Sequence, residues 1–437
     1  MQTPFDLARQ AFMQGVAAFG AGRLEEADSA FVASLAALPG RPSTLANLAA
    51  VRIRLGRPAE ALPMLDQSLA QDERAPDAWC HRGEALALLG RAAEALAAYD
   101  RALALEPNNA AARFQRTTPL SALGRHAEVL AALDALLAGR PGHLESWLRR
   151  GLTLQALERP ADALASFERA LQVDATSALA WSQRGAILKD MQRLPEAADC
   201  FRQALAHGGD AELNGYYLAS VQGAHDEAAP QAAPRHYVEG LFDSYAEGFD
   251  AHLTQVLGYR TPSVLAAQLP AGRRFARALD LGCGTGLMGP LLEPVVDVLD
   301  GVDLSSLMLE KARALGLYRE LAHGDVVEFM QAAAQRGQRW DLVVAADVFV
   351  YIGALGPVFA AVAATLAPGG VFAFSLEEAE AGRELELRAS SRYAHSEAYV
   401  RGLAAAHGFV VEALRRDTLR HDQRRPIPGL CVRLAPA

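Results

Sequence analysis

Residues 276–292 read ARALDLGCGTGLMGPLL, and this stretch decides the fold of the second half of the chain. The apolar run 278–281 predicts a short buried strand. The alternate glycines from Gly282 to Gly286 then predict a tight turn before a helix that begins near Leu287. Glycines let a backbone pass close to a ligand where side chains would clash. Because open α/β sheets bind ligands at the carboxyl ends of their strands, we expect this turn to form a binding site.

The glycine spacing separates this turn from the dinucleotide-binding fingerprint. That fingerprint is G-x-G-x-x-G, whereas Gly282, Gly284 and Gly286 alternate here after an aspartate. The DLGCGTG run resembles the first motif of class I S-adenosylmethionine-dependent methyltransferases, of the type 11 and type 12 kind. The resemblance implies S-adenosyl-L-methionine as the cofactor. It places the following residues of the turn around that cofactor: Asp280, Gly282, Cys283, Gly284 and Gly286.

Two later segments carry further cofactor-binding positions of this family. LDGVDLS, residues 299–305, places Asp303 at the end of a second strand, where an acidic residue accepts hydrogen bonds from the ribose hydroxyls and Leu304 flanks the adenine. HGDVVEF, residues 323–329, places Asp325 and Val326 at the end of a third strand, where the family's acid bonds the adenine amino group. Tyr245, upstream of the glycine turn, is predicted to close the cofactor pocket, as Phe249 and Tyr259 also could; the alternative for at least one of the three is core packing.

The remaining strands follow in the order of the same fold. RWDLVVAADVFVYIG gives a fourth strand over 340–345 that ends at Asp347, and LAPGGVFAFSLE gives a fifth. HGFVVEALRRDTL and IPGLCVRLAP predict two closing strands, as an antiparallel hairpin. The resemblance therefore implies a Rossmann-like, seven-stranded class I methyltransferase domain over residues 237–437.

The sequence is less specific about the residues that would bind the methyl acceptor. The resemblance places Asp347 and Tyr351 there, after the fourth strand, as candidate catalytic residues. No Asn/Asp-Pro-Pro-aromatic run follows that strand, so methylation of exocyclic amines of nucleic-acid bases is disfavoured. His395 is the candidate general base by residue type. Its alternative is a position at the start of a helix that Ser396 caps and that runs to His407.

Two arginines remain open between two readings. Arg392 and Arg420 could recognise an acidic acceptor, or they could lie on the solvated surface. No sequence motif distinguishes methylation on oxygen, nitrogen or carbon.

The first half of the chain repeats itself every 34 residues. Trp147 and Trp181 are one period apart, Trp79 lies two periods before Trp147, and a glycine follows each tryptophan by four residues. Columns of small and aromatic residues keep the same frame, which gives six units that start near residues 8, 42, 76, 110, 144 and 178. The pattern resembles the tetratricopeptide repeat and predicts an α-solenoid of helix pairs. The fourth unit has Arg113, Thr117 and Val129 at key positions, so we expect local irregularity there.

These patterns divide the chain into repeats over 1–221, a linker over 222–236 and the methyltransferase domain over 237–437. The linker QGAHDEAAPQAAPR breaks the helical period with two prolines. In the segment 237–262 that follows, Leu241, Tyr245, Phe249, His252 and Leu253 roughly follow one helical face. That segment is either a helix packed on the domain or a lid over the cofactor pocket.

Composition limits the partners. The chain has 437 residues, 51% hydrophobic and 21% charged, with a formal charge of −9, which argues against nucleic acid. Its four cysteines are scattered, so no metal site is expected. No signal peptide or membrane span is apparent, and a cytoplasmic location is expected.

Three functions therefore remain open. The repeats could recruit a protein or peptide acceptor to the enzyme through their groove. They could instead serve assembly of an enzyme that acts on a small molecule. The third alternative is an adaptor whose methyltransferase domain is inactive. The sequence leaves the oligomeric state unknown.

Overall fold

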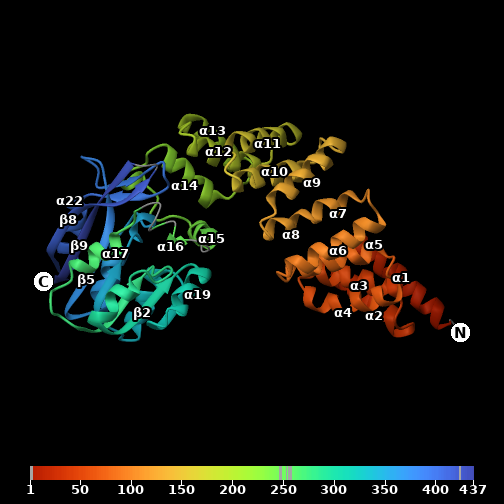
Figure 1. Ribbon diagram of the computed structural model, residues 1–437, viewed down its shortest axis with the longest axis horizontal. Helices are drawn as coiled ribbons and strands as arrows, with labels where there is room; N and C mark the ends of the chain where they lie inside the picture. The colour runs from red at the N-terminus through yellow and green to blue at the C-terminus, as the bar shows by residue number, and fades with distance from the viewer. Residues whose placement is uncertain (1–2, 246–248, 252, 254–257, 423–424) are drawn as a thin grey trace. The chain divides into compact units, whose positions relative to one another are not determined.

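The computed structural model describes residues 3–245, 249–251, 253, 258–422 and 425–437. The chain forms two compact units, Met1–Ala180 and Trp181–Ala437. The first is entirely helical, and the second places helices around a large sheet (Figure 1). The predicted fold class, an α-solenoid followed by an α/β sheet domain, is confirmed. His252 lies outside the described residues. No helix of the described part is long and apolar enough to cross a bilayer.

The helices of the repeats follow one another in pairs, and each pair is joined by a short turn. In chain order they are α1 (Pro4–Gly20), α2 (Leu24–Ala37), α3 (Pro42–Arg54), α4 (Pro58–Gln71), α5 (Pro76–Leu88), α6 (Ala92–Leu105), α7 (Ala110–Gln115), α8 (Thr117–Ala122), α9 (His126–Gly139), α10 (Leu144–Ala156) and α11 (Pro160–Val173). The pattern continues into the second unit with α12 (Ala178–Asp190), α13 (Leu194–Ala206) and α14 (Ala211–Val221).

A glycine on the first helix of a pair lies against an aromatic ring of the second. A Cβ built on Gly151 would come within 2.5 Å of the Phe167 ring, and one on Gly185 within 2.7 Å of Phe201. Two other pairs repeat this contact at 2.7 and 2.8 Å, namely Gly15 with Phe31 and Gly83 with Tyr99. The repeating glycines are therefore needed because the helices approach too closely for any side chain.

The predicted irregularity in the fourth unit is confirmed. Its first helix is interrupted at Arg116, which separates α7 from α8. The hydroxyl of Thr117 donates to the carbonyl of Phe114 at 2.6 Å and so replaces a regular helical bond. Arg149 of α10 then donates to the same carbonyl and hydroxyl and lies 4.1 Å from the centroid of the Phe114 ring. The side chain of Arg149, which belongs to the next repeat, thus fills the gap between α7 and α8.

The second unit is built on one nine-stranded sheet. Its strands are β1 (Phe275–Leu281), β2 (Val296–Asp303), β3 (Tyr318–His323), β4 (Trp340–Ala345), β5 (Leu366–Glu378), β6 (Leu385–Leu387), β7 (Tyr393–His395), β8 (Phe409–Asp422) and β9 (Arg425–Pro436). Strands β3, β2, β1, β4 and β5 are parallel, and the β8–β9 hairpin adds antiparallel to β5. The short strands β6 and β7 were not predicted, and β7 pairs with the end of β5.

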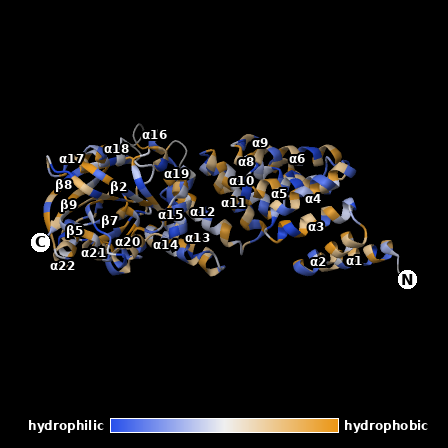
Figure 2. Cartoon of the chain, turned by 90° about the horizontal axis from the view of Figure 1, so that it is seen from below, coloured by the Kyte–Doolittle hydropathy of each residue, from blue (hydrophilic) through white to orange (hydrophobic). Residues whose placement is uncertain are grey.

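Helices cover both faces of this sheet, because its central strands are apolar on both sides. On one face Val343 of β4 and Phe374 of β5 pack against α20 (Val326–Gln335), α21 (Gly356–Thr365) and α22 (Glu397–Ala406). On the other face Val344 and Ala373 pack with α18 (Gly289–Leu292). Figure 2, which colours the chain by hydropathy, shows hydrophobic residues in both units. The other helical segments are η1 (Asp226–Ala228), α15 (Arg235–Tyr245), α16 (Phe249–Ala251), α17 (Thr261–Ala267), η3 (Glu293–Val295), α19 (Ser306–Ala314) and η4 (Phe349–Tyr351).

His395 ends β7 and is fully buried. Its Nε2 lies 2.8 Å from the carbonyl oxygen of Gly353, and its ring stacks on Tyr399 with centroids 5.6 Å apart. Ser396 caps α22, as the alternative reading of this segment predicted. Burial lowers the pKa of His395 to about 4. The imidazole is therefore neutral in the folded protein at neutral pH.

Gly151→Ala should destabilise the first unit by about 1–3 kcal/mol, because the new methyl group would displace the Phe167 ring. Gly142→Ala is the matched control, since its Cβ would meet nothing within 4 Å. Urea unfolding followed by tryptophan fluorescence measures both. Equal midpoints for the two variants would contradict the packing described here.

The stability of the second unit should fall as the pH drops from 6.5 towards 4. In that window the unfolded chain protonates His395, while the folded chain, with its lowered pKa, does not. The gap of 2.5 pKa units corresponds to about 3 kcal/mol at full effect. His395→Gln should lose this part of the pH dependence in thermal melts between pH 4 and 8. A variant with the same dependence as the wild type would show that His395 is solvated.

Candidate functional site

A cavity of about 640 Å³ lies at the carboxyl ends of β1, β2 and β4. Its wall also includes Phe249 and Tyr259, two of the aromatic residues considered from the sequence. Ten of the predicted site residues line this cavity, namely Asp280, Gly282, Cys283, Gly284, Asp303, Leu304, Asp325, Val326, Asp347 and Tyr351. Segments far apart in the chain thus meet where the sequence analysis expected a ligand.

Asp303 holds the glycine turn in place. Its two carboxylate oxygens accept hydrogen bonds from the N–H of Gly284 and the N–H of Ser305, each at 2.8 Å. Gly284 has φ +53°, and a Cβ there would meet nothing within 4 Å, so its open side faces the cavity. Gly282 has φ +60°, and a Cβ there would lie 2.6 Å from Val348. Gly282 therefore permits a close approach of two loops, and Gly284 leaves room for a ligand.

The two aspartates at the strand ends lie in a strongly buried environment. Burial raises the pKa of Asp280 to about 7, against the lowering effect of the 2.7 Å hydrogen bond from the Tyr318 hydroxyl. Burial also raises the pKa of Asp303, although the backbone bonds from Ser305 and Gly284 oppose it. Burial raises the pKa of the Cys283 thiol well above its usual value, so this cysteine is not a reactive thiolate.

Asp325 has a different position from the one predicted. β3 ends at His323, and Asp325 is instead the N-cap of α20, with Val326 as its first residue. One oxygen of Asp325 accepts from the N–H groups of Val327 and Glu328, while the other lies 3.6 Å from Nε of Arg235. Its carboxylate still reaches the cavity wall.

Three predicted site residues do not line the cavity. Gly286 has φ +89°, and a Cβ there would lie 2.8 Å from Leu315, so it serves packing against the end of α19. Tyr245 ends α15 and is 53% exposed. His395 is buried behind the cavity wall, where its low pKa and its contact with Gly353 favour the packing role.

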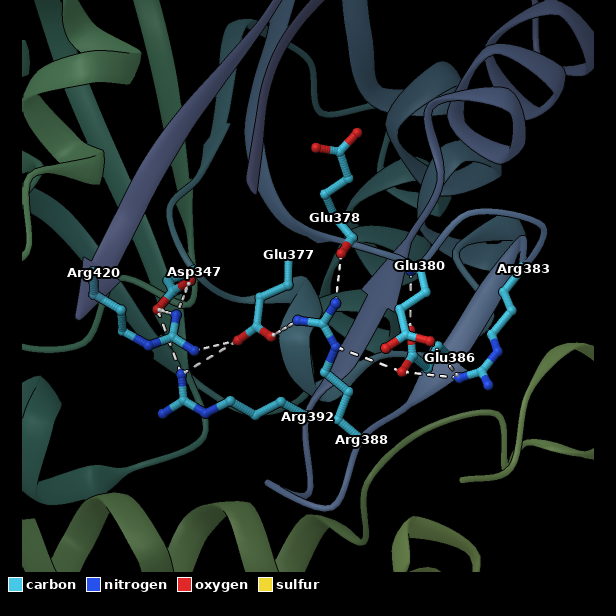
Figure 3. A network of polar contacts seen from close by, with 9 residues as sticks. All are labelled: Asp347, Glu377, Glu378, Glu380, Arg383, Glu386, Arg388, Arg392 and Arg420. Carbon is cyan, nitrogen blue, oxygen red and sulfur yellow. Dashed lines mark hydrogen bonds and ion pairs between the residues drawn. The ribbon is translucent and has the colours of Figure 1, made fainter. Parts of the chain in front are cut away.

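Charged side chains also line the cavity. Asp347 has φ +63°, a conformation that aspartate tolerates, and its N–H donates to the Ser375 hydroxyl. Arg420 donates to both oxygens of Asp347 and to Glu377 (Figure 3). Arg420 is 4% exposed and Arg392 lines the cavity, so the surface reading of these two arginines is wrong.

The segment predicted as a linker also contributes to the cavity wall. The carbonyl of Gln231 accepts from the N–H groups of Gly353 and Ala354, both at 2.8 Å. The N–H of Ala233 donates to the carbonyl of Tyr351 at 2.9 Å. Gln231 and Ala233 both line the cavity. The alanine- and proline-rich composition of the segment 222–236 did not predict these backbone contacts. The domain boundary at 222–236 stays a prediction.

Family comparisons match both parts of the chain. Residues 279–372 match a family model described as a methyltransferase domain. Residues 46–110 and 144–177 match two tetratricopeptide-repeat models. The first match begins in β1 and ends in β5, so it includes the glycine turn and Asp303.

Two curated relatives each match part of the chain. Methyltransferase-like protein 27 of Homo sapiens is 39% identical over 87 residues, which are 19% of this chain and 35% of that protein. Malonyl-[acyl-carrier protein] O-methyltransferase of Enterobacter lignolyticus is 32% identical over 148 residues, which are 34% of this chain and 56% of that protein. The chain therefore spans between a third and somewhat more than half of the length of these relatives.

Among solved structures, the chain resembles a tetratricopeptide repeat protein from Parabacteroides merdae. The TM-score is 0.41 at 20% identity, over 49% of this chain and 84% of that one. The chain thus combines a methyltransferase domain, matched over residues 279–372, with tetratricopeptide repeats, matched over residues 46–110 and 144–177.

Proposed function

We propose that the second unit binds S-adenosyl-L-methionine in the cavity and transfers its methyl group to an acceptor. The observation that carries this proposal is the glycine turn, whose open side at Gly284 faces the cavity and which is tied to the buried carboxylate of Asp303. The match to a methyltransferase domain over 279–372 supports the same reaction.

The residues present fit this cofactor. Both oxygens of Asp303 accept one backbone N–H each, and a carboxylate oxygen has a second lone pair that can accept a ribose hydroxyl. Leu304 and Val326 supply apolar surface in the cavity wall against which an adenine could pack. Asp325 keeps one oxygen free of backbone bonds for the adenine amino group. The cavity also falls within the size range of small-molecule sites.

When bound, the cofactor supplies a methyl group that the positive charge of its sulfonium already activates. The chain then has to hold the acceptor in line with this group and exclude water, which can supply much of the rate. Tyr351 and Asp347, the residues of the predicted acceptor side, line the same cavity. His395 has no place in this proposal, because it does not reach the cavity.

We also propose that the repeats recruit a protein or peptide. The first unit carries a hollow of about 500 Å³ in which Trp147 and Arg150 face Asp134, a mixture of apolar and charged groups that suits a peptide. Assembly of an enzyme for a small acceptor is the second candidate. The adaptor alternative is weaker, because the glycine turn and Asp303 keep a geometry that is open to a ligand.

Gly284→Val should abolish S-adenosylmethionine binding in calorimetry, because its side chain would enter the cavity. Gly272→Val is the matched control. Gly272 has φ +73°, its Cβ would also meet nothing within 4 Å, and it lies outside the cavity wall. Both variants carry the same backbone strain of about 1–2 kcal/mol. Binding by both variants, or by neither the wild type nor the control, would contradict the proposal.

The recruitment proposal predicts that a chain starting at Ser177 still binds S-adenosylmethionine but no longer labels proteins. Full-length and shortened chains are incubated with [methyl-³H]S-adenosylmethionine and a lysate of the source cells, and label is counted in precipitated protein and in the soluble fraction. This truncation keeps α14, whose Tyr216 packs with Val350 and Tyr351. Equal labelling of a small molecule by both chains would favour the assembly role instead.

A further inference from the structure

We propose that the group methylated is a carboxylate, which Arg392 binds and which leaves as a methyl ester. This inference rests on the proposed function, since it takes S-adenosylmethionine as the methyl donor. The proposal assigns a substrate class to the acceptor side of the cavity. The carboxylate could belong to a protein, a peptide or a small molecule.

Arg392 presents to the cavity a guanidinium that has only long ion pairs and no hydrogen bond to a carboxylate. Its side chain is 28% accessible and belongs to the cavity wall. Its nearest carboxylate oxygens, on Asp347 and Glu377, both lie 3.9 Å from the same nitrogen, Nη1, which is beyond hydrogen-bond distance. Figure 3 shows the two dashed contacts leaving this one nitrogen. The guanidinium forms no hydrogen bond with any other described residue, so its five donors are available to a ligand.

The neighbouring Arg420 differs in this respect. Its Nη1 donates to both oxygens of Asp347, at 3.1 and 2.8 Å, and its Nη2 donates to Glu377. Arg388 donates to the other oxygen of Glu377 at 2.9 Å. The two carboxylates are thus satisfied without Arg392, and their charges are met by other arginines. Arg392 is the member of this network that faces the cavity with its donors unused.

Hydrogen bonds hold the residues on both sides of Arg392 in place. The carbonyl of Ser391 accepts from the Tyr216 hydroxyl at 2.6 Å, and the Tyr393 hydroxyl donates to the carbonyl of Pro230 at 2.8 Å. The guanidinium carbon lies 5.7 Å from the centroid of the Tyr351 ring, in cation–π contact. A planar fork held in this way suits the two oxygens of a carboxylate, which it can bind with two parallel hydrogen bonds.

The side chains near Arg392 offer little that could remove a proton from an acceptor. Burial raises the pKa of Tyr351, and burial raises the pKa of Tyr259 well above its usual value, so both stay protonated. Asp347 is engaged through both oxygens by Arg420. His395 lies outside the cavity wall. Hydroxyl and amine acceptors need a base to take a proton during transfer, whereas a carboxylate is already ionised at neutral pH.

The reaction of a carboxylate balances without a proton. One carboxylate oxygen forms a bond to the methyl carbon while the carbon–sulfur bond breaks, and the electron pair of that bond stays on sulfur. The products are a neutral methyl ester and a neutral thioether. Loss of the acceptor's negative charge removes its attraction to Arg392, which favours release of the product.

The test uses the full chain, [methyl-³H]S-adenosylmethionine and a lysate of the source cells. Labelled products are treated with mild alkali, which hydrolyses methyl esters to volatile methanol but leaves N-, C- and ether O-methyl groups intact. We expect most of the label to become volatile. Alkali-stable label would overturn the carboxylate proposal while leaving methyl transfer intact, so the two failures are distinguishable.

Arg392→Gln should lower the initial rate of labelling by about 100-fold, the loss typical of removing one partner of a desolvated charge pair. Its affinity for S-adenosylmethionine in calorimetry should stay within about threefold of the wild type, since Asp303 and the glycine turn are untouched. Arg392→Lys should recover part of the rate, because it restores the charge without the planar fork.

Arg383→Gln is the matched control. Arg383 belongs to the same network, through Glu380 and Glu386, and is 34% accessible, but it lies outside the cavity wall. The control should label at the wild-type rate. Equal rates for Arg392→Gln and Arg383→Gln, or no labelling by a wild-type chain that binds S-adenosylmethionine, would overturn the assignment.

Discussion

One buried carboxylate joins the parts of the cavity. Asp303 ends β2, and its two oxygens accept from Gly284 in the turn after β1 and from Ser305 at the start of α19. A carboxylate that is 8% exposed is costly unless its lone pairs are used, and here the ends of two neighbouring strands use them. This constraint sets the path of the glycine turn and keeps its open side towards the cavity.

Much of this architecture could be predicted from local sequence signals. The 34-residue period gave the helix pairs, and the close contact of Gly151 with Phe167 explains why the period is conspicuous. The fourth strand was placed at its observed bounds, because its apolar run is buried on both faces. Asp280, Gly284 and Asp303 meet in one cavity because they lie at or just after the carboxyl ends of adjacent parallel strands.

The remaining features depend on contacts between distant segments, which a local pattern does not record. Strands β6 and β7 have three residues each and pair mainly through their backbones, so no alternation of apolar and polar residues predicted them. The sequence could not decide between a surface position and a site position for Arg392 and Arg420, because their partners, Asp347 and Glu377, lie at the ends of other strands. Backbone hydrogen bonds hold residues 231–233 at the cavity wall, and the composition of a segment does not predict such bonds. Gly286 kept the family motif but serves packing against Leu315.

Amide hydrogen exchange of the full chain, with and without S-adenosylmethionine, reports whether the cavity at the glycine turn holds this compound. We expect slower exchange in peptides that contain Gly284, Ser305 and Tyr351, with the repeats of the first unit unchanged. Unchanged exchange at the glycine turn, or protection confined to the repeats, would contradict binding in this cavity.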